Sequence, residues 1–140
     1  MKVKWNMNDP EDVQLHIPAE DTTVDVSVEA LGQGRYRLTN FPIGACRLRF
    51  GDVIEARLLP DGVLEYVRRV ERTPFKIYSY IVSSKAVESE TLRRLLDKVL
   101  DLGGHWERVF GGVLLIALPK GVEWDPESDF PAAEDFAKNE

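Results

Sequence analysis

Residues 34–57 read GRYRLTNFPIGACRLRFGDVIEAR, and they contain the strongest structural signals in the chain. Gly32-Gln33-Gly34 allows a tight reversal of the backbone, after which residues 35–38 alternate polar and apolar side chains as a strand does. Pro42 breaks regular strand pairing, and Gly51-Asp52 starts a new apolar run. This stretch therefore predicts a hairpin, a proline break and the start of a further strand.

Short strands are predicted on both sides of this stretch. Apolar residues occupy every second position in residues 3–7, 13–17 and 24–28, which is the pattern of a half-buried strand. A turn signal precedes residues 63–70, which form the next apolar strand. Residues 1–73 therefore predict an antiparallel β-meander or an SH3-like small barrel, because either arrangement buries one face of such strands and limits exposed edges.

The pattern changes at Pro74. Residues 75–82 form a denser apolar strand, and residues 89–102 carry leucines and a valine at helical spacing. Two further strands on either side of Gly111-Gly112 form a second hairpin. Residues 74–119 therefore predict a β-α-β-β unit, which is half of a ferredoxin-like fold, and the chain as a whole is expected to be α+β.

Residues 120–140 lose this periodicity. The segment 125–129 is polar and contains a proline, and at most one short helical turn is expected over residues 130–136. We expect an acidic, partly disordered tail in this part of the chain. The three segments, residues 1–73, 74–119 and 120–140, are also compatible with one compact domain overall.

Charge is distributed unevenly along the 140 residues, whose net charge is −6. Residues 1–30 hold two Lys against seven Asp and Glu, and residues 121–140 hold one Lys against seven, whereas residues 31–76 are net basic. Acidic ends disfavour unspecific binding to nucleic acids, and they suit either solubility or a cationic partner. The single Cys46 excludes an internal disulfide, and without an apolar leader or a membrane-spanning run the expected compartment is the cytoplasm.

Three short motifs resemble those of a family of small bacterial proteins of unknown function. They are Gly34-Arg35-Tyr36, Asn40-Phe41-Pro42 and Gly51-Asp52-Val53, which follow in the same order in that family. The likeness extends more weakly over residues 28–119. The resemblance implies no reaction, but some relatives look like immunity proteins, which inhibit secreted bacterial toxins. The family continues into another helix where this chain has its acidic end.

Few residues have the pattern of a catalytic or metal site. Cys46 lies beside Arg47, which can activate a thiol. The two histidines, His16 and His105, are distant in sequence, so a small buried hydrophobe is the better interpretation of the cysteine. His105 and Glu107 lie on the same face if their segment is a strand. Two ligands are too few for a metal site, so we favour a role as polar side chains at the edge of a sheet. We expect no enzymatic activity, cofactor or metal.

The basic residues of the opening stretch have two interpretations. Interleaved with aromatic residues, they are able to bind a single strand of nucleic acid. In a meander they more simply form the solvent face of the sheet, where nearby carboxylates balance them, and we favour this second interpretation. The arginines are Arg35, Arg37, Arg47 and Arg49, and the carboxylates are Asp52, Glu55 and Glu65.

The leading hypothesis is a non-enzymatic protein-binding role, as an immunity protein that covers the active surface of a cognate, basic toxin. Acidic and aromatic residues near the C-terminus are then the expected contacts. They are Trp124, Asp125, Glu127, Asp129, Phe130, Glu134 and Asp135. The alternative is a small-molecule-sensing regulatory module, with a closed pocket lined by Tyr78, Tyr80 and Trp106.

Overall fold

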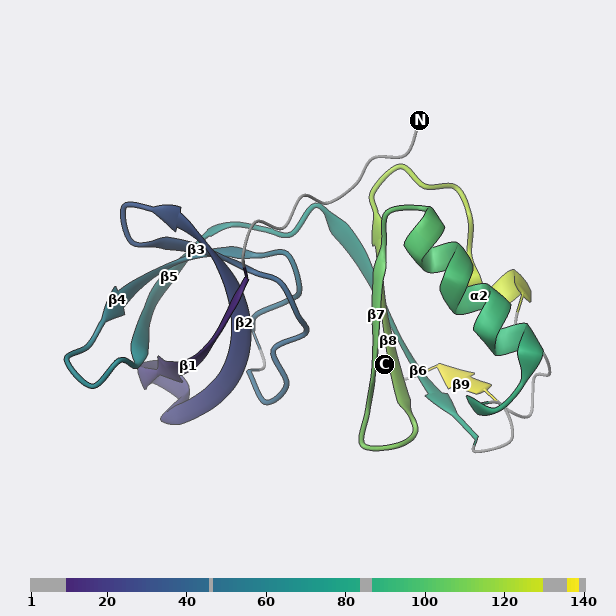
Figure 1. Cartoon of the computed structure of the whole chain (residues 1–140), viewed down its shortest axis with the longest axis horizontal. Coiled ribbons are helices and arrows are strands. Elements are labelled where there is room, and N and C mark those ends of the chain that lie inside the picture. The colour runs from purple at the N-terminus through teal and green to yellow at the C-terminus, as the bar shows by residue number, and fades with distance from the viewer. Residues whose placement is uncertain (1–9, 46, 84–86, 130–135, 139–140) are drawn as a thin grey trace. The chain divides into compact units, whose positions relative to one another are not determined.

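The computed structural model describes residues 10–45, 47–83, 87–129 and 136–138 (Figure 1). The chain folds into two compact units, which divide between Pro74 and Phe75. Among the described residues, the first unit consists of strands and a short 3-10 helix, and the second combines strands with an α-helix of 12 residues. Within the described residues, no helix is long and apolar enough to cross a membrane.

Five strands of the first unit close into a barrel in the order β1-β2-β3-β4-β5 (Figure 1). Each strand pairs antiparallel with the next, whereas β1 and β5 pair in parallel. The parallel closure follows from the odd number of strands, because the first and last then run in the same direction. The elements are β1 (Glu11–Ile17), the 3-10 helix η1 (Pro18–Glu20), β2 (Thr22–Gly32), β3 (Arg35–Leu38), β4 (Val53–Leu58) and β5 (Leu64–Glu71).

The barrel core consists of the apolar residues that alternate along these strands. In β2, Val24, Val26 and Val28 are buried while Asp25 between them is exposed, as the period of two predicts. Residues from the other strands and from the β3–β4 connection complete the core. They are Leu15, Ile17, Leu38, Ala45, Leu48, Ile54, Ala56 and Leu64.

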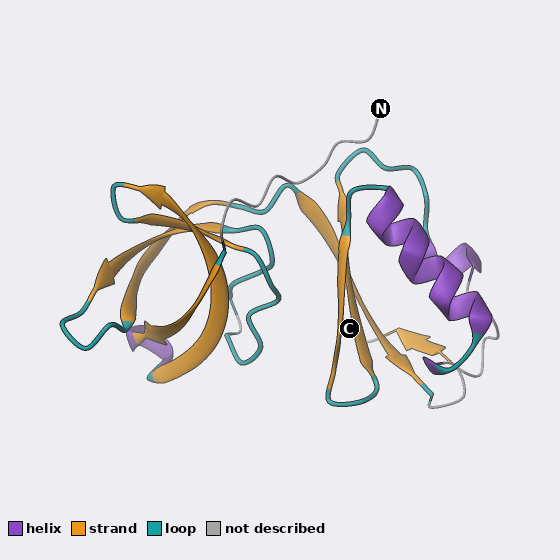
Figure 2. Cartoon of the chain, viewed as in Figure 1, coloured by secondary structure: helices purple, strands orange, loops and turns teal. Residues whose placement is uncertain are grey.

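The second unit is a four-stranded sheet in the order β7-β8-β6-β9, with helix α2 on one face (Figure 2). Both β6 and β7 pair antiparallel with β8, so β6 and β7 run parallel to each other, and β9 pairs antiparallel with β6. The elements are β6 (Phe75–Val82), α2 (Glu90–Asp101), β7 (His105–Val109), β8 (Val113–Pro119), η2 (Pro126–Asp129) and β9 (Phe136–Lys138). The expected α+β class with an N-terminal barrel is confirmed.

Helix α2 begins and ends close to the predicted positions. Ser89 is its N-cap, because its hydroxyl accepts a hydrogen bond from the backbone N–H of Leu92 at 3.1 Å. At the other end, the turn into β7 packs tightly against β8. A Cβ atom on Gly104 would lie 2.4 Å from the carbonyl oxygen of Ala117, so this position excludes any side chain.

Two short elements lie in the C-terminal segment for which the sequence predicts an acidic tail. Residues 126–129 form η2, and residues 136–138 form β9, which extends the sheet beside β6. Strand β9 has three residues and is defined by its backbone pairing with β6. Three residues are too few for hydrophobic periodicity to predict a strand. The expected strand over residues 3–7 and most of the expected helical turn, residues 130–135, lie outside the described residues.

Candidate functional site

A cavity of about 440 Å³ lies between α2 and β7, which is one of the two edge strands of the sheet. Most of its lining is apolar, and the remainder is charged. Sites for small molecules in proteins have this size and this kind of lining, an apolar wall with a few polar groups. The lining residues are Val82, Val87, Leu92, Arg93, Leu96, Asp97, Trp106, Arg108 and Leu114.

Helix α2 contributes two pairs of neighbouring residues, one turn apart. Leu92 is buried and Leu96 is partly buried in the core under the helix, because their spacing of four places both on the face toward the sheet. Arg93 and Asp97 directly follow these leucines, and both are exposed. The helix therefore gives the cavity an apolar wall and a charged rim.

Strand β7 provides the facing side of the cavity. Trp106 and Arg108 are two residues apart in the strand and so lie on the same face of the sheet. Trp106 packs partly buried in the core under α2, whereas Arg108 is exposed. Arg108 is opposite the buried Leu114 of β8 in the register of the two strands. The guanidinium therefore extends from an apolar part of the sheet.

The charged side chains of the rim make few contacts with the fold. Arg93 approaches Glu90 at 3.8 Å, but both side chains are well exposed, so the pair contributes little. In the part of the chain that the structure describes, the side chains of Asp97 and Arg108 have no hydrogen-bond or ion-pair partner. Arg93, Arg108 and Asp97 therefore place two positive charges and one negative charge at the rim of an apolar cavity. These charges contribute little to the stability of the fold.

The opposite face of the sheet carries the histidine and glutamate that the sequence singled out. His105 Nε2 and Glu107 Oε2 are 2.9 Å apart, and both side chains are partly buried. Among residues 10–45, 47–83, 87–129 and 136–138, no group of three or more His, Cys, Asp or Glu side chains is arranged to hold a metal ion. The pair is therefore consistent with polar side chains at the edge of the sheet, on β7.

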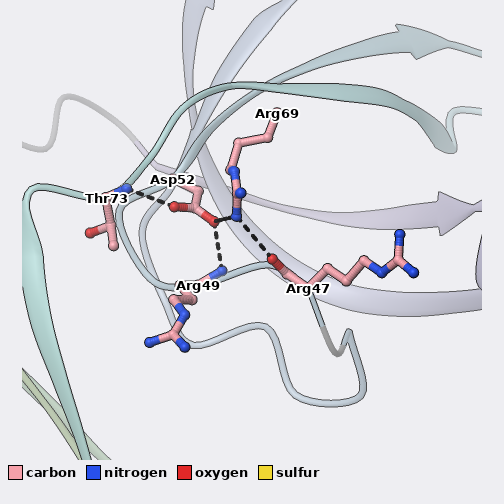
Figure 3. A network of polar contacts seen from close by, with 5 residues as sticks. All are labelled: Arg47, Arg49, Asp52, Arg69 and Thr73. Carbon is pink, nitrogen blue, oxygen red and sulfur yellow. Dashed lines mark hydrogen bonds and ion pairs between the residues drawn. The ribbon is translucent and has the colours of Figure 1, made fainter.

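In the barrel, the most elaborate polar network centres on Asp52, whose side chain is only 1% exposed (Figure 3). Its Oδ1 accepts a hydrogen bond from the backbone N–H of Thr73 at 2.7 Å, and its Oδ2 accepts one from that of Arg49 at 2.9 Å. The guanidinium of Arg69 lies 3.6 Å from Oδ2 and donates to the carbonyl oxygen of Arg47 at 3.2 Å. The buried carboxylate therefore ties the start of β4 to the end of β5, which is a structural role.

Three ion pairs join neighbouring strands of the barrel. Arginine and glutamate lie directly opposite each other in the strand registers, which is the geometry that stabilises such pairs. The solvent-face interpretation of the arginines named from the sequence stays a prediction. The pairs are Arg37 with Glu29, Arg57 with Glu65 and Arg68 with Glu55. Glu55 and Glu65 therefore balance arginines of β4 and β5. Of the four arginines named from the sequence, Arg37 alone has an ion pair with a residue that the structure describes.

Trp124, one of the C-terminal contacts expected from the sequence, is used by the fold itself. Its ring packs partly buried in the core under α2, and Lys98 Nζ lies 4.7 Å from the ring centroid. A cation at this distance from an indole ring is attracted to its π-face. Trp124 therefore helps to attach the segment after β8 to the helix.

The other expected contacts are distributed along the same segment. Asp125 is exposed, and its carbonyl oxygen accepts a hydrogen bond from the Ser128 hydroxyl at 2.7 Å. Glu127 and Asp129 belong to η2. Cys46, Phe130, Glu134 and Asp135 lie outside the described residues.

Sequence reasoning anticipated one residue of the cavity and missed its charged rim. Of the three aromatic residues named for a pocket, Trp106 lines it, whereas Tyr78 and Tyr80 stack with ring centroids 6.2 Å apart and belong to the core. The spacing of two between Trp106 and Arg108 was the available signal, because it places a cation and an aromatic ring on one face of an edge strand.

Comparison with known proteins identifies a similar fold and no family. The sequence matches no family model and no curated protein. The fold is similar to that in a crystal structure of a hypothetical protein from Neisseria gonorrhoeae, with a TM-score of 0.60 and 10% sequence identity, over 96% of this chain and 95% of that chain. At this identity the likeness extends to the fold alone. The resemblance to the bacterial family of unknown function stays a prediction.

Proposed function

We propose that this protein is a non-enzymatic binding protein whose second unit holds a small molecule in the cavity between α2 and β7. The cavity carries this proposal, because its volume of about 440 Å³ lies in the range of small-molecule sites. Such a role corresponds to the regulatory, ligand-sensing alternative expected from the sequence.

The lining supports the proposal energetically. Apolar side chains that face an open cavity lack partner atoms on one side, and a bound ligand restores those contacts. Trp106 and Leu96 are both only partly buried, so each has surface that a ligand would cover. The rim charges then orient the ligand, since they are not committed to the fold.

The strand order of the second unit also supports the proposal. In the order β7-β8-β6-β9, strands β6 and β7 are parallel and separated by β8, which is the split β-α-β arrangement of a half-ferredoxin unit. We propose this assignment, and that of the barrel as SH3-like, as the finer fold classes. Half-ferredoxin units often sense small molecules at sheet edges, and β7 is an edge strand here.

A pair of helix variants tests whether the cavity binds ligands. The neutral apolar dye N-phenyl-1-naphthylamine becomes fluorescent in an apolar site, and we expect the wild-type protein to bind it. Leu96→Trp fills the cavity from α2 and is expected to weaken dye binding at least about tenfold, because the bound dye loses most of its apolar contact area.

Leu100→Trp is the matched control. Leu100 lies one turn further along the same helix, is exposed and does not line the cavity, so this variant should bind the dye like the wild-type protein. No binding to the wild-type protein, or equal losses in the two variants, would contradict the proposed function.

The immunity-type role expected from the sequence is a second, separate proposal. Phe110, at the turn between β7 and β8, favours it, because its side chain is 82% exposed and exposed aromatic residues often anchor protein contacts. Co-expression with the product of the adjacent upstream gene tests this role. We expect a stable complex and protection of the cell, both weakened by Phe110→Ser, and the absence of both would reject the role.

A further inference from the structure

The rim of the cavity indicates which ligands fit it. We propose that the cavity binds small aromatic monocarboxylates, with the ring against Trp106 and Leu96 and the carboxylate at Arg108. This inference rests on the proposed function and specifies the ligand class of the same site. It starts from a cationic side chain that extends from the apolar face of β7.

Arg108 has the chemistry and the freedom to bind a carboxylate. A guanidinium presents donors in a planar fork that matches the two oxygens of a carboxylate. Among the described residues its side chain has no ion-pair partner, so binding an anion would break no existing contact. Arg93 adds a second positive charge from α2, and its contact with Glu90 at 3.8 Å is weak.

The apolar wall favours an aromatic body for the ligand. Trp106 and Arg108 share one face of β7, so a molecule whose carboxylate meets the guanidinium has its ring beside the indole. Aromatic rings gain from contact with one another beyond the area that they bury. The leucines of α2 and Leu114 of β8 supply the rest of the surface.

Asp97 limits the charge of the ligand. Its exposed carboxylate lies on the rim, one turn after Arg93, and has no partner among the described residues. A second carboxylate on the ligand would be repelled by it, so the rim, with one net positive charge, fits a monoanion. The same repulsion reduces the affinity for the preferred ligand to a smaller extent.

Isothermal titration of the full chain with matched probes tests the inference. The probes are 2-naphthoate, 2-naphthalenemethanol and 2-naphthylmethylamine, which share one ring system and differ in charge. We expect 2-naphthoate to bind about tenfold more tightly than the alcohol, which is the size of effect that a charge-assisted hydrogen bond gives. The amine should bind most weakly.

Variants of the rim assign the preference to named side chains. Arg108→Gln should remove the preference for 2-naphthoate over the alcohol, and Arg108→Lys should keep part of it. Asp97→Asn should tighten 2-naphthoate binding and reduce the penalty for naphthalene-2,6-dicarboxylate. Arg94→Gln is the control, because Arg94 is an exposed arginine of the same helix that does not line the cavity.

The outcomes separate the ligand class from the existence of the site. Equal affinities for 2-naphthoate and the alcohol would overturn the inferred ligand class but still show a ligand-binding cavity. Tighter binding of the amine would also overturn it, and would mean that the carboxylate of Asp97 selects a cationic ligand. An unchanged preference in Arg108→Gln also overturns it. If none of the three titration probes binds but N-phenyl-1-naphthylamine does, the inferred ligand class is wrong and the proposed function stands. If neither the probes nor the dye binds, the proposed function is wrong as well.

Discussion

The two units of this chain use their charged residues differently. In the barrel, arginines lie opposite glutamates in the strand registers, and the buried Asp52 accepts two backbone hydrogen bonds. In the second unit, Asp97 and Arg108 have no partner among the described residues and border an apolar cavity. The buried carboxylate of Asp52 stabilises the fold, whereas we propose that the charges beside the cavity contact a ligand. This difference is why we assign the scaffold role to the barrel and the binding role to the second unit.

The largest test of this comparison removes the centre of the barrel network. Asp52→Ala leaves the backbone N–H groups of Arg49 and Thr73 without their buried acceptor and Arg69 without its carboxylate. We expect the free energy of unfolding of the barrel to fall by about 4 kcal/mol. Urea unfolding, followed through the amide NMR signals of each unit separately, measures this change.

Asp52→Asn is the graded control. A side-chain amide has one oxygen, so it can accept only one of the two backbone hydrogen bonds, and an intermediate loss is expected. A loss below about 1 kcal/mol in the alanine variant would mean that the network does not hold the barrel, because that is the size of one ordinary hydrogen bond.

The second test concerns the packing behind the cavity. In Gly104→Ala the new Cβ would lie 2.4 Å from the carbonyl oxygen of Ala117 and 2.9 Å from that of Val99, so the backbone must shift. We expect a loss of about 3 kcal/mol in the stability of the second unit, measured by urea unfolding with tryptophan fluorescence. Trp106 and Trp124 both pack in the core of this unit and report on it.

Gly111→Ala is the matched control in the same unit. Gly111 has a positive φ of 77° but nothing within 4 Å of an added Cβ, so only backbone strain opposes the change. We expect a loss of about 1 kcal/mol. If the two alanine variants were equally stable, close packing at Gly104 would not be a constraint on the fold.

The smallest test compares a paired with an unpaired arginine. Arg68→Gln removes the exposed ion pair with Glu55, whose atoms are 2.9 Å apart, and should cost about 0.5 kcal/mol. Arg108→Gln should leave the stability unchanged, because its side chain has no partner among the described residues. Thermal unfolding of both variants at low salt measures the difference. A larger loss for Arg108→Gln would contradict our separation of fold charges from ligand charges.

Local signals in the sequence predicted the local structure. The Gly32-Gln33-Gly34 reversal lies at the β2–β3 turn, where Gly32 and Gly34 have positive φ angles that favour glycine. Alternation predicted β2, and leucine spacing after Ser89 predicted α2. For residues 1–73 the sequence predicted either an open β-meander or a small barrel. Alternating apolar residues predict strands, but they do not show whether the first strand pairs with the last.

Contacts between distant residues could not be predicted in the same way. The pairing of β9 with β6 depends on backbone groups and has no periodic signature over three residues. The cavity combines residues of β6, α2, β7 and β8, and each of these residues alone looks like an ordinary core or surface position. Only their arrangement in space distinguishes Arg108 from the other exposed arginines.

The short parallel pairing between β1 and β5 has a consequence for how the barrel folds. β1 and β5 are aligned only at Leu15 with Leu64 and at His16 with Glu65, whereas β1 and β2 are aligned over the whole length of β1. The partners in the short contact are the first and last strands of the barrel, so this contact is its least local one, and non-local contacts form slowly. Without β5, the strand order leaves β1 and β4 as the two edges of the sheet. The transition state for folding of the barrel should therefore contain the β1–β2 and β2–β3 pairings, with closure by β5 as its final step.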